Sequence, residues 1–386
     1  MPRPAGFLPG EPVDGDVVAY FGDDPRKLYQ LRQWLPVLEQ LDTHHRVLVV
    51  TRDPHSYAEA CSTTSLSVVC APTMPDLMAL YEASAFRLAL YVNNSMYNFV
   101  SLMSRTMLHV HINHGESDKV CMVSNQVKAY DRVFVAGQAA IDRHRAALVG
   151  FDHGKLVQVG RPQLDLRPAP VLPASDAPTI LYAPTWEGEN ASNDYTSVVK
   201  YGPRIVAAAL AVPGARVVYK PHPRVVTSTT PAVRTAHAEI LRLLRGGHAA
   251  LTEADILAVF PGCDLMITDV SSVGLDFLYV RGDKPMFVTD IRGDRERLRA
   301  EVPVSRCADI VDDASIGALT RILTDRLTND VHRAARTALR GFYFGDLEPG
   351  ESTARFIGAV TEVIELRDRL AGDAGLDPAL FSGRPA

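Results

Sequence analysis

The sequence contains few cysteines, and its five, Cys61, Cys70, Cys121, Cys263 and Cys307, form no C-x-x-C pair. An odd count without paired spacing argues against a disulfide framework and against a structural zinc site, so a reducing compartment fits best. No apolar run approaches the roughly 18 to 20 residues of a membrane-spanning helix, and the first residues lack the apolar core of a signal peptide. We therefore expect a cytoplasmic protein, or one held at a membrane from the cytosolic side.

An excess of positive charge is also missing. The chain has 40 Lys and Arg residues against 45 Asp and Glu, and the net charge of −5 argues against binding nucleic acid by bulk charge. A G-x-x-x-x-G-K-[ST] loop, a G-x-G-x-x-G motif after the first strand and a G-x-S-x-G elbow are all absent. ATPase, dinucleotide-dehydrogenase and α/β-hydrolase functions thereby lose their main support.

What the sequence does contain is a regular alternation of short apolar runs and amphipathic segments. The length of 386 residues suits two or three domains, and the 47% apolar share excludes disorder. Apolar runs separated by helical patterns predict mainly parallel sheets covered on both faces, hence doubly wound α/β domains. The predicted strands are Asp16–Phe21, Arg46–Val50, Leu66–Ala71, Arg87–Val92, Leu108–Ile112, Arg132–Ala136 and Leu156–Val159, then Thr179–Ala183, Ala215–Tyr219, Asp264–Thr268, Pro285–Val288 and Ala308–Val311.

A proline-rich stretch separates the two series of strands. Five prolines fall between Pro162 and Pro178, a composition typical of an interdomain linker. A last amphipathic helix is predicted over Gly350–Ala371. We predict an N-terminal Rossmann-like domain over residues 1–165, a C-terminal one over 175–345, and a tail over 346–386 whose helix packs back toward the first domain.

Three histidines lie in or just after the predicted strand Leu108–Ile112. His109 and His111 share one strand face, which favours buried structural roles with satisfied ring nitrogens. His114 lies beyond the strand end beside Gly115, where a ligand can approach closely, so it suits a general base, although a structural histidine fits this spacing equally well. A metal site is the weaker interpretation because a strand does not make the three rings converge, and we expect no metal.

A second candidate is the segment Lys220–Arg224, which follows the predicted strand Ala215–Tyr219. Prolines on both sides of His222 restrict its backbone. Lys220 and Arg224 add positive charge that suits a phosphate or a pyrophosphate. An exposed proline turn with incidental charges is the alternative.

The third candidate begins at Asp269, directly after the predicted strand Asp264–Thr268. Ser271 and Ser272 fall where the next helix begins, and hydroxyls with unpaired N–H groups at a helix N terminus bind anions. The serines are equally compatible with simple helix caps. Asp269 is expected either to orient a hydroxyl or a histidine, or to cap the helix.

Two smaller signals complete the set. Thr185 and Trp186 follow the predicted strand Thr179–Ala183, and the tryptophan is expected either to stack on a base at a cleft or to lie in the core. Ser352 and Thr353 open the last predicted helix, where their hydroxyls either face an anion or cap the helix.

The order of these motifs is informative. NHGESDK, YDRVFVAG, LVQVGRPQLD, ILYAPTW, YKPHP, DLMITDVSSVGLDFLY and FYFGDLEPGEST follow one another along the chain. The set resembles the CDP-glycerol glycerophosphotransferase family, which includes primases and polymerases of teichoic acids and capsule polymers. The resemblance spans about Leu108 to Thr353. It implies a GT-B fold, with two Rossmann-like domains facing a central cleft and the donor nucleotide bound mainly by the second.

The resemblance also implies roles for single residues. His114 matches the presumed base that takes a proton from the acceptor hydroxyl, and His222 matches a histidine that contacts the donor pyrophosphate and stabilises the leaving CMP. The implied donor-phosphate contacts are Lys220, Arg224, Asp269, Ser271, Ser272, Ser352 and Thr353, and Thr185 and Trp186 are expected at the nucleotide. The implied donor is CDP-glycerol or CDP-ribitol, without a further cofactor.

The sequence departs from the family pattern at two positions. Glu116 stands where threonine is usual, and Val270 stands where tyrosine is common. A glutamate near a developing phosphate charge is repulsive unless it binds the acceptor or Lys119 neutralises it. We therefore assign Gly115, Glu116 and Lys119 to the acceptor.

The family implies a polymer or polyprenyl-linked acceptor and peripheral contact with the cytoplasmic membrane face, although the sequence has no polybasic run. Two other classes stay open. One is a GT-B glycosyltransferase or epimerase that uses a UDP- or GDP-sugar. The other is a non-catalytic binding or scaffold protein that kept the fold.

Overall fold

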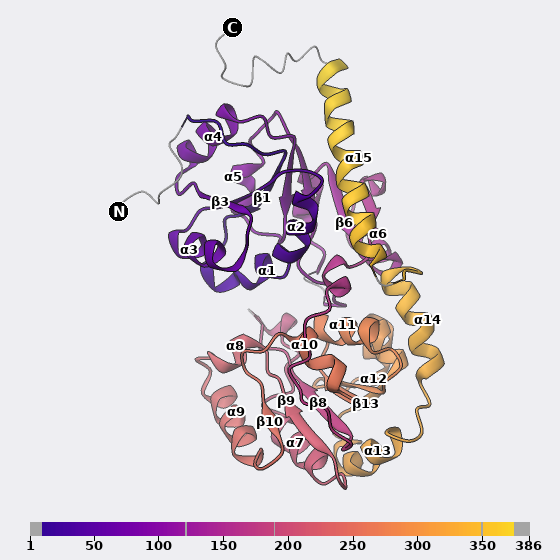
Figure 1. Ribbon diagram of the computed structural model, residues 1–386. Helices are drawn as coiled ribbons and strands as arrows, with labels where there is room; N and C mark the ends of the chain where they lie inside the picture. The colour runs from indigo at the N-terminus through magenta and orange to yellow at the C-terminus, as the bar shows by residue number, and fades with distance from the viewer. Residues whose placement is uncertain (1–9, 120–121, 189, 349, 374–386) are drawn as a thin grey trace. The chain divides into compact units, whose positions relative to one another are not determined.

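The computed structural model describes residues 10–119, 122–188, 190–348 and 350–373 (Figure 1). The chain divides into two compact units. Unit 1 comprises the described parts of Met1–Gly115, Val123–Leu166 and Gly345–Ala386, and unit 2 comprises those of Glu116–Met122 and Arg167–Phe344. The outer ends of the predicted domains, at residues 1–9 and 374–386, and Cys121 lie outside the described residues.

Unit 1 contains a seven-stranded parallel sheet with the strand order β3-β2-β1-β4-β5-β6-β7. Its chain order reverses between β1 and β4, and ligands of such sheets bind at the carboxyl ends of the strands at this switch point. The strands lie within one residue of their predicted ends, because they are mostly apolar and, apart from the half-buried β7, largely buried. They are β1 (Val17–Phe21), β2 (Val47–Thr51), β3 (Ser67–Cys70), β4 (Leu88–Tyr91), β5 (Leu108–His111), β6 (Arg132–Val135) and β7 (Leu156–Gln158).

Local capping fixes where several helices of unit 1 begin. Helix α3 starts at Pro54 behind Asp53, whose carboxylate accepts from two backbone N–H groups, and α4 starts with a capping box between Thr73 and Asp76. The helices that connect the strands are α1 (Tyr29–Arg32), α2 (Leu35–Asp42), α3 (Pro54–Thr63), α4 (Met74–Ala83), α5 (Asn98–Ser101) and α6 (Gln138–Ala147).

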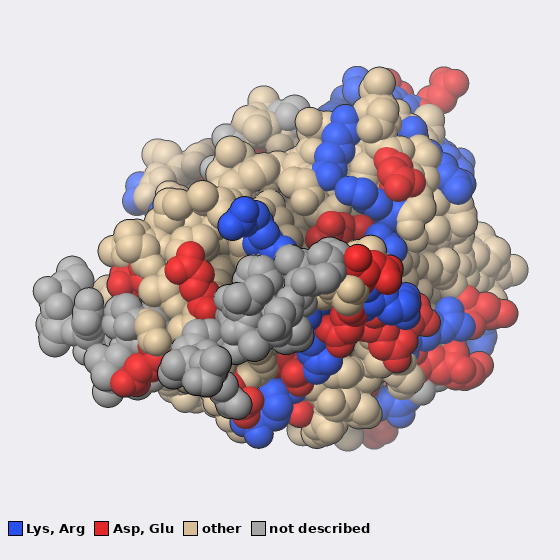
Figure 2. Space-filling model, turned by 90° about the horizontal axis from the view of Figure 1, so that it is seen from above, with Lys and Arg blue, Asp and Glu red and all other residues tan. Residues whose placement is uncertain are grey.

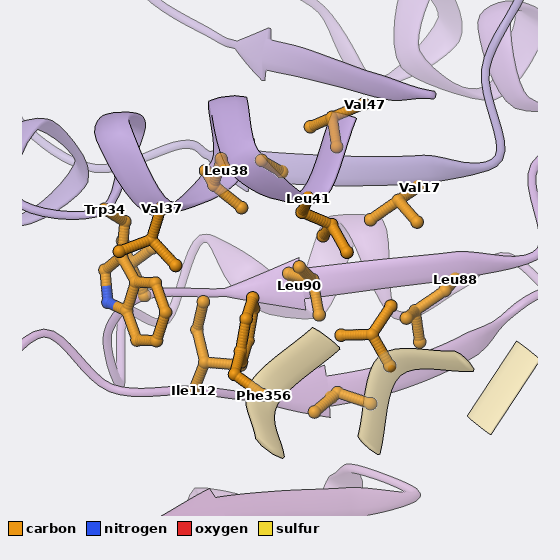
Figure 3. Packing of buried hydrophobic residues seen from close by; sticks show 14 of the residues in the cluster. Val17, Trp34, Val37, Leu38, Leu41, Val47, Leu88, Leu90, Ile112 and Phe356 are labelled. Atoms are coloured by element: carbon orange, nitrogen blue, oxygen red, sulfur yellow. The ribbon is translucent and has the colours of Figure 1, made fainter. Parts of the chain in front are cut away.

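The last helix, α15 (Glu351–Asp373), belongs to the core of unit 1. Phe356 lies beside Trp34 and Ile112 (Figure 3), with its ring centroid 5.1 Å from that of Trp34 and 6.0 Å from that of Phe134. One turn further along, Val360 is fully buried on the same helix face. The predicted helix is therefore present and completes the hydrophobic core of this unit.

Unit 2 repeats the same architecture with six parallel strands in the order β10-β9-β8-β11-β12-β13, and its switch point lies between β8 and β11. The strands are β8 (Thr179–Ala183), β9 (Arg216–Tyr219), β10 (Ala249–Ala250), β11 (Leu265–Thr268), β12 (Met286–Thr289) and β13 (Asp309–Val311). The sequence did not predict β10, because two residues are too short to give an apolar pattern.

Helices flank this sheet as well (Figure 1). They are α7 (Gly202–Leu210), α8 (Pro223–Val226), α9 (Pro231–Leu243), α10 (Ile256–Val259), α11 (Ser272–Val280), α12 (Arg295–Glu301), α13 (Leu319–Arg326) and α14 (Arg333–Phe344). The helix predicted from Ser197 begins only at Gly202. The Ser197 hydroxyl is hydrogen-bonded to the Tyr182 hydroxyl at 2.7 Å, and this contact holds Ser197 in the loop before the helix. Within the described residues, no helix is long and apolar enough to cross a membrane.

Removal of the Phe356 ring tests the attachment of α15. We expect Phe356→Ala to destabilise unit 1 by about 3 to 5 kcal/mol, because the ring leaves a cavity between Trp34 and Phe134. The exposed neighbour Arg355 provides the control, and Arg355→Ala should change stability by less than about 0.5 kcal/mol. Denaturant unfolding followed by tryptophan fluorescence measures both; equal effects would contradict the packing role.

Candidate active site

Three loops meet at the carboxyl edge of the unit 2 sheet, on both sides of its switch point. Thr185 and Trp186 follow β8, the Lys220–His222 segment follows β9, and Asp269 follows β11. The backbone joins the first two loops, since Lys220 N–H donates to the Tyr182 carbonyl at 2.9 Å and His222 N–H donates to the Pro184 carbonyl at 3.1 Å. The structure thus brings together the residues predicted from three separate motifs.

Asp269 is the centre of this edge and is 1% exposed. One carboxylate oxygen accepts from the Thr185 N–H at 2.8 Å, and the other accepts from the Thr289 hydroxyl at 2.6 Å. Burial raises the pKa of Asp269, while hydrogen bonds from Ser197 and these two groups act in the opposite direction. Both oxygens are occupied by the protein, so Asp269 holds the loops in position rather than presenting a free ligand for phosphate.

Helix α11 presents its N terminus at the same edge. Ser271 is the N-cap residue in an extended conformation, and its side chain makes no capping hydrogen bond. A Cβ atom at Gly274 would lie 3.2 Å from Thr268 Cγ2, so glycine lets the helix pack close to β11. The first backbone N–H groups and the helix dipole therefore favour an anion beside Ser271 and Ser272.

His222 is fixed by a hydrogen bond that also determines its tautomer. The backbone N–H of Arg224 donates to His222 Nδ1 at 3.1 Å, so in the neutral ring the proton lies on Nε2. The Arg224 guanidinium lies 4.2 Å from the centroid of the half-buried Trp186 ring, whose centroid is 6.2 Å from that of His222. Arginine, tryptophan and histidine thus form one layer along the edge.

Two lysines add positive charge to this edge. Lys220 is 7% exposed, and burial lowers the pKa of its ammonium group, which donates to the Pro221 carbonyl at 3.2 Å. Lys119, predicted for the acceptor side, donates to the Thr185 hydroxyl at 3.2 Å and lies 5.5 Å from the Tyr195 ring centroid. Tyr195 and Thr289 also lie at this edge, and they were not predicted because neither belongs to a sequence motif.

His114 lies in a tightly held turn of unit 1, at the carboxyl end of β5. The preceding Asn113 has a φ of 52°, uncommon for a residue other than glycine, and its side-chain oxygen accepts from the His114 N–H at 2.8 Å. The Asn113 carbonyl accepts from Trp34 Nε1 at 2.5 Å, and the His114 carbonyl accepts from Arg161 Nη1 at 3.1 Å. Backbone strain of this kind is typical of functional sites.

The imidazole of His114 is neutral at physiological pH. Burial, followed by the positive charges of Arg161 and Lys27, lowers its pKa to about 4. Its Nδ1 has no hydrogen-bond partner among the described residues, and the Tyr29 ring lies edge-on with 6.2 Å between centroids. A neutral imidazole with an unpaired nitrogen is able to accept a proton. Gly115 follows directly, and Glu116 is 5% exposed.

The other two histidines of this segment are buried, as predicted, but only one is satisfied. His109 is hydrogen-bonded to the Tyr91 hydroxyl at 2.8 Å and to the Ser104 carbonyl at 3.0 Å. His111 lies against the Tyr130 ring, and within the described residues neither of its ring nitrogens has a partner, which corrects the prediction. The described residues also hold no group of three potential metal ligands, and the absence of a metal requirement stays a prediction.

Ser352 and Thr353 are occupied inside unit 1. The Ser352 hydroxyl accepts from the Arg161 N–H at 3.1 Å, and a Cβ atom at Gly160, which has a φ of +76°, would come within 2.2 Å of it. Asp165 accepts from the Thr353 N–H at 2.7 Å and from its hydroxyl at 2.8 Å. A carboxylate of the chain therefore occupies the N terminus of α15, which favours the structural alternative, and contact of Ser352 and Thr353 with the donor phosphates stays a prediction.

The buried histidines predict an acid-sensitive unit 1. Burial lowers the pKa of His111 to about 3 and that of His114 to about 4, so below pH 6.5 the unfolded chain binds protons that the folded chain does not. The free energy of unfolding should therefore fall as the pH falls from 6.5 toward 4, by up to about 1.4 kcal/mol per pH unit for each histidine.

Urea denaturation between pH 7.5 and 4.5 measures this dependence. His111→Phe, which retains a ring against Tyr130, should make it shallower, whereas the same change at the exposed His55 should leave it unaltered. Equal slopes in wild type and His111→Phe would contradict the assignment.

The Asp269 network predicts a second effect on stability. Asp269→Ala leaves the Thr185 N–H and the Thr289 hydroxyl without their acceptor, so we expect unit 2 to lose about 2 to 4 kcal/mol. Thr289→Val should cost about 1 kcal/mol, and Asp283→Ala at an exposed position should be nearly neutral. Calorimetry of the three variants provides the measurement, and equal melting temperatures for Asp269→Ala and Asp283→Ala would refute the linking role.

The chain is similar to known proteins in sequence and in fold. The family model for CDP-Glycerol:Poly(glycerophosphate) glycerophosphotransferase matches residues 111–301. A search of the curated proteins finds no significant match.

Among solved structures, a variant of the wall teichoic acid polymerase TagF soaked with CDPG has 13% identity and a TM-score of 0.59, over 93% of this chain and 90% of that one. A Listeria monocytogenes protein described as a UDP-N-acetylglucosamine 2-epimerase has 14% identity and a TM-score of 0.61, over 91% and 97%. A glycosyltransferase from Rickettsia africae has 12% identity and a TM-score of 0.53, over 93% and 100%.

These structural matches confirm the predicted GT-B class of α/β fold. The family match covers the strand end that holds His114 and the three loops around Asp269. Over residues 111–301, the match to the CDP-glycerol:poly(glycerophosphate) glycerophosphotransferase family model confirms the resemblance identified from the sequence motifs.

Proposed function

We propose that the protein transfers glycerol phosphate, or a related polyol phosphate, from a CDP-activated donor to a hydroxyl of a cell-wall or capsule polymer or a lipid-linked acceptor, with release of CMP. The strongest support is the edge of unit 2, where the N terminus of α11, Lys220 and His222 gather at the switch point of a Rossmann-like sheet. Together with the family match over residues 111–301, this edge favours a nucleotide with a pyrophosphate.

In the proposed reaction, the acceptor oxygen forms a bond to the phosphorus that bears the polyol, and the bond from this phosphorus to the CMP oxygen breaks. His114 takes the proton of the acceptor hydroxyl, a role for which its neutral ring is suited. The charge that develops on CMP is stabilised by the N–H groups of α11, by Lys220 and by His222. We assign no step to a metal or to a further cofactor.

The tautomer of His222 supports its role at the phosphate. Because Nδ1 accepts from the Arg224 N–H, the neutral ring presents Nε2–H as a donor to a phosphate oxygen. Trp186 and the Arg224 guanidinium above it supply a flat surface beside this donor, on which we place the nucleotide.

The membrane contact implied by a lipid-linked acceptor is also part of the proposal. On the face shown in Figure 2, Lys and Arg residues are interspersed with Asp and Glu residues. This face therefore gives no broad electrostatic attraction to anionic lipids.

Incubation of the purified full chain with CDP-glycerol, CDP-ribitol, UDP-sugars or GDP-sugars and with glycerol phosphate oligomers tests the function. We expect CMP release and products that grow by one polyol phosphate in mass. Release of UDP or GDP would favour a glycosyltransferase or an epimerase, which share the fold. Donor binding without turnover on any acceptor would favour a binding protein.

The base assignment gives a separate prediction. His114→Ala should lower the rate of CMP release by about 10² to 10⁴-fold, because a general base supplies a factor of this size, while the KM for CDP-glycerol stays near that of the wild type. His55→Ala removes an exposed histidine of unit 1 and should react like the wild type. Unchanged turnover in His114→Ala would exclude it as the base.

A further inference from the structure

A group of polar side chains that no sequence motif contains lies at the switch point of the unit 1 sheet. It consists of Asp23, Lys27, Gln30 and Asn93, and we call it the Asp23 cluster. The first three follow β1, and Asn93 follows β4, so the cluster joins the two strands between which the chain order reverses. The residues of β1 and β4 themselves are apolar or aromatic and buried, and polarity begins only beyond their carboxyl ends.

The members of the cluster are hydrogen-bonded to one another. Asn93 Nδ2 donates to Gln30 Oε1 at 2.8 Å and to Asp23 Oδ2 at 3.3 Å, and Lys27 Nζ donates to the same oxygen of Asp23 at 3.3 Å. Asp23, Gln30 and Asn93 are only 7 to 8% exposed, whereas 35% of the Lys27 side chain is exposed. Three nearly buried polar side chains and a half-exposed cation thus form one connected group.

The cluster retains hydrogen-bonding capacity after these contacts. A carboxylate has roughly four lone-pair sites, and among the described residues three donors reach Asp23, the third being the Asp24 N–H at 2.8 Å from Oδ1. The Lys27 ammonium has three N–H groups, of which one is directed at Asp23. Donors and an acceptor therefore remain side by side, a combination that matches neighbouring hydroxyls together with a negative charge.

The cluster lies beside the candidate base. Tyr29, between Lys27 and Gln30 in the chain, has its ring against that of His114, and its hydroxyl accepts from Gln30 Nε2 at 3.4 Å. We propose that the Asp23 cluster binds the terminal polyol unit of the acceptor: Asp23, Gln30 and Asn93 hold its hydroxyls, and Lys27 binds the adjoining phosphodiester. This inference rests on the proposed function, because it names the part of the protein that recognises the acceptor.

Near-isosteric substitutions test the proposal in the full chain. We expect Lys27→Met to raise the KM for a glycerol phosphate oligomer about tenfold or more, and Gln30→Met to raise it about three- to tenfold, with the KM for CDP-glycerol within twofold of wild type. Arg26→Met and Gln33→Met, which change exposed side chains of the same segment, should behave like wild type. Measurements at pH 8 keep His114 neutral in every variant. An unchanged oligomer KM in both cluster variants, or an equal rise in both KM values, would overturn the proposal.

Saturation-transfer NMR with the same oligomer separates this inference from the proposed reaction, since it needs no turnover. Binding by the wild type that is weakened in Lys27→Met and Gln30→Met supports the cluster even if no CMP is released. Equal binding by the wild type and both variants, or no binding by the wild type at millimolar oligomer, overturns it even if CMP release is observed. Thermal melting identifies a variant that does not fold. If one of the two cluster variants fails to fold, oligomer binding by the other variant tests the proposal.

Discussion

The candidate active-site edge of unit 2 depends on the hydrogen bonds to one buried carboxylate. Asp269 accepts from the loop after β8 and from the end of β12, while it follows β11 itself. A buried carboxylate is unfavourable unless its oxygens are satisfied, so the arrangement is stable only when these strand ends are in place together. The positions of Thr185 and of the N terminus of α11 both follow from this constraint, and so does the surface on which we place the donor phosphates.

The electrostatic requirement in unit 1 differs from that in unit 2, because the candidate base of unit 1 has to be uncharged. Burial and the nearby Arg161 and Lys27 keep the pKa of His114 low, so the ring is uncharged at neutral pH, as the reaction that we propose requires of the base. The same burial is expected to lower the stability of unit 1 in acid. His111 adds to this loss of stability, and within the described residues neither of its ring nitrogens makes a hydrogen bond. The stability of unit 1 is therefore expected to depend on pH through a histidine of β5 and a histidine of the turn that follows this strand.

Much of the fold could be predicted from the sequence. Parallel strands buried on both faces are continuous apolar runs, and the positions of 12 of the 13 strands in the described residues followed from such runs to within one residue. The exception, β10, pairs with β9 through two residues only. The start of α7 was also predicted too early, because Ser197 is hydrogen-bonded outside the helix to Tyr182.

The sequence by itself determined the two series of strands, the loops that follow them and the polar residue types in these loops, since these properties depend on neighbours along the chain. Only the tertiary structure decided which of these polar groups are hydrogen-bonded to other parts of the protein. Both α15 and α11 begin with a pair of hydroxyl residues. Asp165 accepts hydrogen bonds at the N terminus of α15, whereas the Ser271 side chain makes no capping hydrogen bond at α11. It also placed Asp23 beside Asn93, 70 residues apart in the chain. The physical reason is that parallel strands distant in sequence end at a common edge, so the partners of a side chain there come from segments that no local pattern connects.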